Sequence, residues 1–256
     1  MTNTQRPDRT FIGIAALVFA ACAAVTITWC GSMSAMPGME MPGGWTMSMA
    51  WMRMPGQSWS GAAATFLGMW SVMMVAMMLP VLMPTLSRYR ASRRGDAGLS
   101  KQTALVAAGY FTVWMLFGIA AYPLGLALAE ATMRVPELSR AIPVASGLVL
   151  AAAGLLQFSR WKSRLLACCR EIPGCCGERR SASDAWRLGL ELGRQCLNCC
   201  LGPTAALLVI GVMDLRAMAL VTIAICAERL LPQGERAARV IGAILIASAP
   251  FVIQQS

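Results

Sequence analysis

Long apolar runs constrain this chain more than any other feature of its sequence. Charged residues make up only 13% of it, against about 25% in soluble domains, and about 20 consecutive apolar residues can cross a bilayer as one helix. Length and polarity define seven such runs, of which the last three are short: 11–30, 62–86, 102–129, 141–159, 197–213, 217–231 and 239–253. The sequence therefore predicts an all-α, polytopic helical membrane protein with about seven transmembrane helices.

Lys and Arg indicate the side of the membrane on which each connection lies, because they concentrate in cytoplasmic segments. If the N-terminus is cytoplasmic, the 22 basic residues of the chain lie almost entirely inside, and the exceptions are Arg53, Arg134, Arg140 and Arg216. This distribution predicts a multi-pass protein with a cytoplasmic N-terminus. It also accounts for the net charge of +10 without nucleic acid, so the expected partner is the lipid bilayer.

Three regions follow from this topology. Residues 1–30 form an N-terminal transmembrane anchor, with a cleaved signal peptide as the alternative because basic residues precede the apolar run. Residues 31–61 form an exported Met-rich loop. Residues 62–256 form a six-helix membrane domain, which includes a cytoplasmic Cys-rich loop at 160–200.

The chain contains no histidine and ten cysteines. It therefore lacks the commonest protein ligand of zinc and divalent copper, and the imidazole that serine and cysteine nucleophiles need. We accordingly do not expect an enzyme. Any bound metal must be held mainly by sulfur.

The exported loop is unusually rich in methionine. Eight methionines lie between residues 31 and 56, in M-x2-M and M-x-M spacings, and Pro and Gly keep the backbone extended. Thioethers are soft donors that suit monovalent copper. We predict copper capture by this loop, with the ligands Met36, Met39, Met41, Met47 and Met49. The alternative is an amphiphilic loop that rests on the bilayer surface and is anchored by its tryptophans.

The second apolar run carries another methionine pattern. Met69, Met73 and Met77 are spaced i, i+4 and i+8, and Met74 and Met78 follow on an adjacent line. On an α-helix these side chains form one contiguous face. The pattern predicts a thioether ladder for a soft cation, with metal ligands at Met73, Met77 and Met78. A helix interface packed with flexible side chains is the alternative.

Seven of the cysteines lie between residues 168 and 200, on the predicted cytoplasmic side, where clustered cysteines are more often metal ligands than disulfides. In the segment CLNCC, Cys196, Cys199 and Cys200 share one face of a helix. Three thiolates there would hold copper(I) in trigonal geometry. Zinc is the alternative ion and needs a fourth ligand, such as Cys169.

The charged neighbours of these cysteines support the same interpretation. We expect Arg170 and Arg194 to lower the thiol pKa and favour the metal-bound form. Glu228 and Arg229 lie at the end of a predicted span, where their charged groups are expected to reach the interface. Packing of small residues and thiol exchange through the C-x2-C motif are the alternatives to a metal site.

Four segments of the chain resemble a bacterial family of predicted metal-binding integral membrane proteins of otherwise unknown function. The segments are MWSVMMVAMMLPVLMP, GLVLAAAGLLQFSRWKSRLLACCREIP, GRQCLNCCLG and VIGVMDLRAMALVTIAICAERLLPQGER. The resemblance implies a bacterial inner (cytoplasmic) membrane protein. It places family positions at Trp70, Met73, Met77, Met78, Lys162, Cys169, Arg170, Cys196, Cys199, Cys200, Met213 and Glu228.

These patterns together predict a membrane copper(I)-handling protein that captures, transfers or delivers the ion through Met and Cys ligands. An accessory or assembly subunit of a larger membrane metalloenzyme complex is the alternative, because short terminal spans and a small soluble portion are typical of partner-dependent proteins. The expected protein partner is a membrane metalloenzyme or a copper chaperone. The chain has no nucleotide-binding motif, so it is not expected to be a pump.

Overall fold

The protein is almost entirely helical. Its structure, a computed structural model, describes residues 9–34, 38–48, 51, 56–96, 98–170 and 181–254. A short hairpin, β1 (Met39–Glu40) and β2 (Thr46–Met47), follows the first helix. The helices of the described ranges are α1 (Arg9–Ser34), α2 (Trp59–Ser92), α3 (Leu99–Arg134), α4 (Pro136–Gln157), α5 (Arg160–Arg170), α6 (Ala182–Ile210), α7 (Leu215–Leu230) and α8 (Gly234–Gln254). The all-α prediction is confirmed, and each predicted apolar run coincides with a helix.

Five helices are long and apolar enough to cross a membrane, namely α1, α2, α3, α4 and α8. Helix α6 is charged in its first half. Helix α7 has 16 residues, which at 1.5 Å per residue span about 24 Å, less than the roughly 30 Å of a hydrocarbon core. The count of seven spans and the cytoplasmic N-terminus therefore stay predictions.

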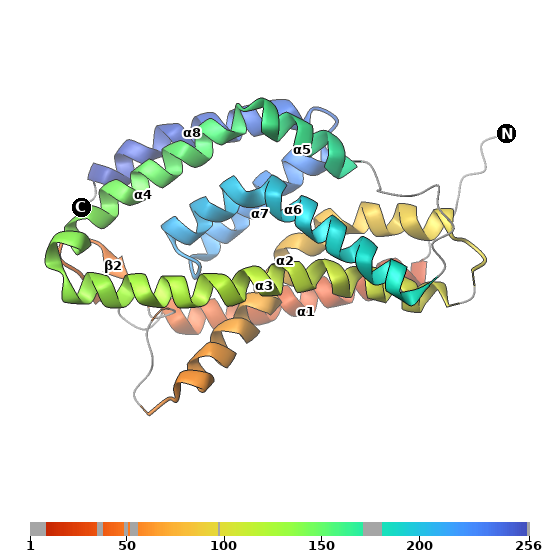
Figure 1. Cartoon of the computed structure of the whole chain (residues 1–256), viewed down its shortest axis with the longest axis horizontal. Coiled ribbons are helices and arrows are strands. Elements are labelled where there is room, and N and C mark those ends of the chain that lie inside the picture. The colour runs from red at the N-terminus through yellow and green to blue at the C-terminus, as the bar shows by residue number, and fades with distance from the viewer. Residues whose placement is uncertain are drawn as a thin grey trace.

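The helices form a bundle around the hairpin of α6 and α7 (Figure 1). Helices α4 and α8 run side by side along one edge, while α1, α2 and α3 lie on the opposite side of that hairpin. Helix α3 makes its most extensive contact with α6, and α4 with α8. The α6–α7 hairpin is thus enclosed by the apolar helices, so the side chains near its middle are buried.

Glycine permits the close contact between α3 and α6. A Cβ atom on Gly189 would lie 2.2 Å from the carbonyl oxygen of Val106, and one on Gly109 would lie 2.5 Å from that of Trp186. Both distances are far shorter than van der Waals contact, so the two backbones approach each other only because these positions have no side chain.

The region predicted as a Cys-rich loop at 160–200 is helical wherever the structure describes it. Its first part is α5, and α6 continues from Ala182 without a break into the apolar run. Ser181 caps the start of α6, because its side chain accepts a hydrogen bond from a backbone N–H that has no partner within the helix. No proline follows in α6 before Pro203. The charged first half of α6 and its apolar second half are therefore one helix, and the CLNCC segment lies on a rigid element.

Proline also helps to attach the β-hairpin to the bundle. A proline inside a helix has no N–H, so the carbonyl four residues earlier loses its helical partner. Pro143 of α4 frees the carbonyl oxygen of Ser139 in this way, and Trp45 Nε1 donates a hydrogen bond to it at 3.0 Å. The Ser139 hydroxyl donates in turn to the carbonyl oxygen of Pro42 at 2.7 Å. The hairpin is thereby fixed to the start of α4.

Candidate metal centre

The cysteines of α6 share one buried helix face, as their spacing predicts. Cys196, Cys199 and Cys200 are 0%, 1% and 0% exposed. The Sγ atoms of Cys196 and Cys200 are 3.8 Å apart. Two sulfur atoms that each lie about 2.3 Å from one tetrahedral metal ion would be about 3.8 Å apart, so this pair already has the spacing of two ligands to a shared ion.

The thiols continue from this pair toward α5 as a row. Cys199 interacts with Cys200 on one side and with Cys169 of α5 on the other, so the order is Cys169, Cys199, Cys200 and Cys196. In the described part of the chain, no three His, Cys, Asp or Glu side chains form a group that could hold a metal ion. The trigonal three-thiolate site therefore stays a prediction. We call these four residues the thiol row.

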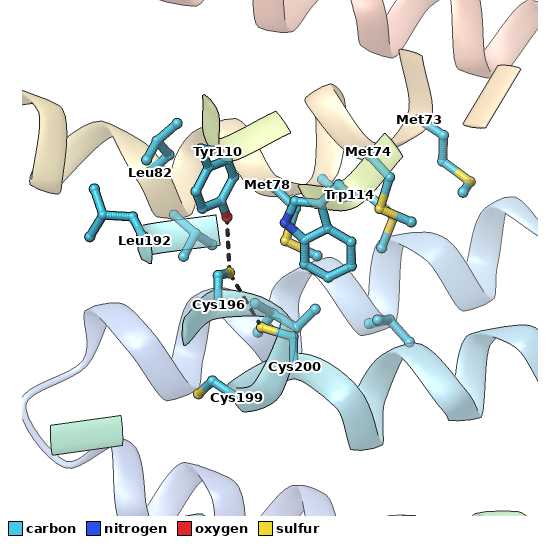
Figure 2. Packing of buried hydrophobic residues seen from close by; sticks show 14 of the residues in the cluster. Met73, Met74, Met78, Leu82, Tyr110, Trp114, Leu192, Cys196, Cys199 and Cys200 are labelled. Atoms are coloured by element: carbon cyan, nitrogen blue, oxygen red, sulfur yellow. Dashed lines mark hydrogen bonds between the residues drawn. The ribbon is translucent and has the colours of Figure 1, made fainter. Parts of the chain in front are cut away.

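The two ends of the thiol row differ in their hydrogen bonds. Tyr110 of α3 donates its hydroxyl to Cys196 Sγ at 2.9 Å (Figure 2), and a hydrogen bond to sulfur favours the thiolate. At the other end, Cys169 Sγ donates to the Gln195 carbonyl oxygen at 3.5 Å. The interaction of Cys169 with Cys199, followed by burial, raises the pKa of the Cys169 thiol.

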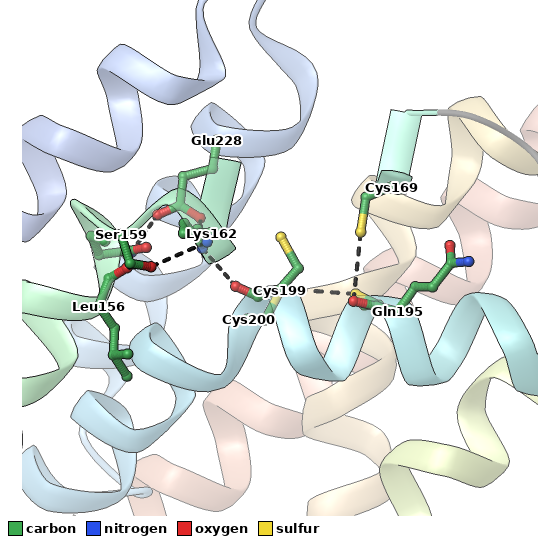
Figure 3. A network of polar contacts seen from close by, with 10 residues as sticks. Leu156, Ser159, Lys162, Cys169, Gln195, Cys199, Cys200 and Glu228 are labelled. Atoms are coloured by element: carbon green, nitrogen blue, oxygen red, sulfur yellow. Dashed lines mark hydrogen bonds and ion pairs between the residues drawn. The ribbon is translucent and has the colours of Figure 1, made fainter. Parts of the chain in front are cut away.

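A buried lysine contacts the middle of the thiol row. Pro203 of α6 lacks the N–H that would pair with the Cys199 carbonyl, and Lys162 Nζ of α5 donates to this freed oxygen at 2.6 Å. The same ammonium group lies 2.6 Å from Glu228 Oε2, and Gln157 Nε2 donates to the other carboxylate oxygen. Figure 3 shows Lys162 between Glu228 and the cysteine segment.

This ion pair shows that the prediction for Glu228 is wrong. Its side chain is fully buried and that of Lys162 is 4% exposed, because Glu228 lies on the face of α7 that packs into the bundle. Burial alone lowers the pKa of the Lys162 ammonium, but negative charge at Cys199 and Glu228 raises it, and the net effect is a raised pKa. Both ions are hydrogen-bonded, which buried charges require.

Arg229 is the second cation beside the thiol row. Its Nη2 atom donates to the Cys169 carbonyl oxygen at 3.4 Å, and its charge interacts with Cys196 and Cys169. Its Nη1 atom is buried and has no hydrogen-bond partner among the described residues. Arg194, which the sequence suggested for this role, is exposed, and the side chain of Arg170 lies outside the described part.

The methionines of α2 lie in the same core as the thiol row. Met73, Met77 and Met78 are 1%, 4% and 0% exposed, and Trp114 of α3 belongs to the same cluster (Figure 2). Such burial is expected if the three methionines form one contiguous face of α2 that packs into the bundle. A thioether ladder and a packed helix interface both fit this placement.

The methionines of the Met-rich segment 31–56 have different surroundings. Met39 on β1 is 41% exposed, whereas Met41 and Met47 are 7% and 2% exposed and pack against Ala129. The two buried thioethers fill an apolar cluster with Ala129 of α3. The predicted ligands Met36 and Met49 lie outside the described residues.

Residue spacing alone does not identify Tyr110, Gln157 or Arg229 as neighbours of the cysteines. One signal was present in the sequence: Pro203 stands four residues after Cys199, which implies an unpaired carbonyl inside the cysteine motif. The donor that fills it could not be identified from that signal, because Lys162 reaches the oxygen from a different helix.

Comparison with known proteins supports a copper-related family. The family PpoB2, described as a copper chaperone, matches residues 67–252. The match includes α5, α6, α7 and the methionines of α2 from Met69 onward, and it excludes the Met-rich segment 31–56. None of the curated proteins and none of the solved structures compared with this chain matches it.

Proposed function

The chain belongs to the PpoB2 copper chaperone family, and from this premise we propose that it holds copper as the monovalent ion on neighbouring pairs of thiols and passes it on without catalysing a reaction. The observation that carries this proposal is the thiol row itself. Its four members come from α5 and α6, and the sulfur atoms of Cys196 and Cys200, 3.8 Å apart, are close enough for one ion to contact both.

The pairwise arrangement favours copper(I) over zinc. Soft thiolates select monovalent copper, and two of them are enough to bind it. Structural zinc needs four ligands arranged around one point, and no such group lies among the described residues. We therefore name copper(I) as the ion.

A row of thiols also provides a way to move the ion. Copper(I) bound to one pair can exchange one thiolate for the next thiol along the row, so that two ligands are kept at every step. Cys169 is at the end of the row, and Cys168 beside it is exposed. We propose that copper enters or leaves the protein at this end.

The proposed setting is a bacterial inner membrane with the N-terminus in the cytoplasm. Five apolar helices and the one-sided distribution of Lys and Arg support it. In this topology the methionines of the exported segment collect copper outside, and Met73, Met77 and Met78 line its path to the thiol row. Replacement of these three by Leu should keep the fold and slow delivery of copper in cells, and unchanged delivery would favour the packed interface.

The proposed recipient is a membrane metalloenzyme, for which the protein acts as an assembly factor. The family description of a chaperone supports this role. Chemical crosslinking in native membranes, followed by purification, should recover one stoichiometric partner. Its copper content should fall when this chain is deleted, and a partner that stays fully loaded would contradict delivery.

Metal analysis of anaerobically purified protein tests the thiol row. The variant Cys196→Ser/Cys199→Ser/Cys200→Ser should lose bound copper, because serine hydroxyls are poor ligands for a soft cation. The matched control is Cys22→Ser/Cys226→Ser, which changes cysteines that are only partly buried and lie outside the row. Equal copper in the wild type and the triple variant would show that the thiols do not hold the ion.

A further inference from the structure

Among the described residues, three charged side chains lie beside the thiol row. Lys162 contacts the Cys199 carbonyl, Arg229 contacts the Cys169 carbonyl, and Glu228 pairs with Lys162. The other polar groups that the described residues bring there, apart from the thiols, are the Tyr110 hydroxyl, the Gln157 amide and the Gln195 carbonyl oxygen, which are uncharged. The two cations and one anion of this described part sum to a single positive charge.

Arg229 carries the charge that is not balanced by these neighbours. Lys162 and Glu228 neutralise each other at 2.6 Å. Arg229 instead donates one hydrogen bond to a backbone carbonyl, and its buried Nη1 atom has no acceptor in the described part of the chain. A buried donor and a buried charge are both costly when they lack a counterpart. A negatively charged metal–thiolate complex beside Arg229 would supply both the missing hydrogen-bond acceptor and the missing negative charge.

The charge of such a complex follows from its chemistry. When two thiols bind one monovalent cation, two S–H bonds break, two sulfur–metal bonds form and two protons pass to water. No electron is transferred. Two thiolates and one monovalent cation have a net charge of minus one, which matches the single positive charge of the surrounding side chains.

We propose that Arg229, Lys162 and Glu228 make the thiol row selective for a soft monovalent cation held by two thiolates. This inference rests on the proposed function and adds the basis of its ion selectivity. A divalent ion on two thiolates is neutral and leaves the positive charge unbalanced. A divalent ion on three or four thiolates would be negatively charged, but no group of three converges in the described residues.

Glu228 is therefore a selectivity-determining residue, although it contacts no sulfur atom. Loss of its charge raises the net positive charge at the row to two, which attracts the negative monovalent complex more strongly and leaves the neutral divalent complex on two thiolates unaffected. Loss of the Arg229 charge lowers the net charge to zero and disfavours the monovalent complex. Loss of both Lys162 and Glu228 leaves the net charge as it is in the wild type.

Competition between silver(I) and cadmium(II) tests this inference in the full-length protein in detergent micelles without oxygen. Bound metals are measured by elemental analysis, and cadmium–thiolate absorbance reports the number of thiolates. Glu228→Gln should shift the preference further toward silver, at least about tenfold, because at the effective dielectric of a protein site a full charge a few ångströms away is worth more than that. Arg229→Gln should weaken silver binding by about as much, and Arg229→Lys should restore it.

Charge-neutral and distant variants complete the test. Lys162→Met/Glu228→Gln should return the metal preference to that of the wild type. Arg216→Gln and Glu235→Gln remove the same charges at exposed positions and should change nothing. If Glu228→Gln does not fold, Arg229→Gln and the double variant still decide the result.

The outcomes separate the two proposals. If the wild type binds silver but neither Glu228→Gln nor Arg229→Gln changes the preference, the charge-based selectivity is wrong and the thiol row stands. If the double variant shifts the preference as far as Glu228→Gln does, these residues act through structure alone and the inference is also wrong. If the wild type binds neither metal, the proposed function itself fails.

Discussion

Sulfur atoms gather in two regions, the thiol row and the β-hairpin. In each region a backbone carbonyl that has lost its helical partner to a proline accepts a hydrogen bond from a side chain. At the thiol row the freed carbonyl of Cys199 accepts from the cation of Lys162. At the hairpin the freed carbonyl of Ser139 accepts from the neutral indole of Trp45. The thiol row has buried charges beside it, whereas the buried hairpin methionines pack against apolar side chains. Buried charge is costly, so a region that keeps it is more typical of a functional site than of a packed core. The number of sulfur atoms does not make this distinction, because both regions contain them.

The largest effect is expected at the buried charges. Glu228→Ala should lower the free energy of unfolding by about 3–5 kcal/mol, because it leaves Lys162 charged and unpaired. The exposed control Glu235→Ala should stay within about 0.5 kcal/mol. Denaturant unfolding in detergent micelles measures both. Equal losses in the two variants would mean that the charges at the thiol row are not buried as described.

The contact that brings Tyr110 to the thiol row should be the next most sensitive. Gly189→Ala places a Cβ atom 2.2 Å from the Val106 carbonyl oxygen, and overpacking of this kind costs about 1–3 kcal/mol. Gly68→Ala is the matched control, since a Cβ there has nothing within 4 Å; it should be neutral or stabilising by about 0.5–1 kcal/mol. Thermal unfolding compares them, and a fully stable Gly189→Ala protein would contradict the close α3–α6 contact.

A smaller effect is expected where the hairpin is attached. Trp45→Phe removes the hydrogen bond to Ser139 and keeps an aromatic ring, so it should cost about 0.5–1.5 kcal/mol. Copper content should not change. Unfolding and metal analysis of the same preparation measure both quantities. A loss of copper in this variant would make the hairpin part of the metal site and remove the contrast with the thiol row.

The smallest effect is expected from Met41→Leu/Met47→Leu. Leucine is close to methionine in volume, and such exchanges are the best tolerated in packed cores, so both stability and bound copper should stay near those of the wild type. Met39→Leu, at an exposed position, should instead lower copper uptake in cells if the exported segment collects the ion. The reverse result would assign the copper-binding role to the buried pair.

The elements of the fold follow largely from local sequence pattern. Apolar runs predict helices because only intrahelical hydrogen bonds satisfy the backbone in an apolar environment, and each predicted run is a helix in the structure. The face shared by Cys196, Cys199 and Cys200 follows from the helical repeat alone. The composition changes from polar to apolar within the 182–210 helix, so the sequence pattern predicts a loop followed by an apolar run although no proline marks a boundary between them.

The sequence by itself determined the helices, the lack of imidazole and the sulfur ligands with their spacing on each helix. Only the tertiary structure decided which charges face those ligands, because Lys162, Glu228 and Arg229 reach the thiol row from α5 and α7 across helix contacts. Helical periodicity describes neighbours within about one turn. The environment of a buried thiol depends on the packing of separate helices, and here that packing depends on Gly109, Gly189 and their contacts between α3 and α6.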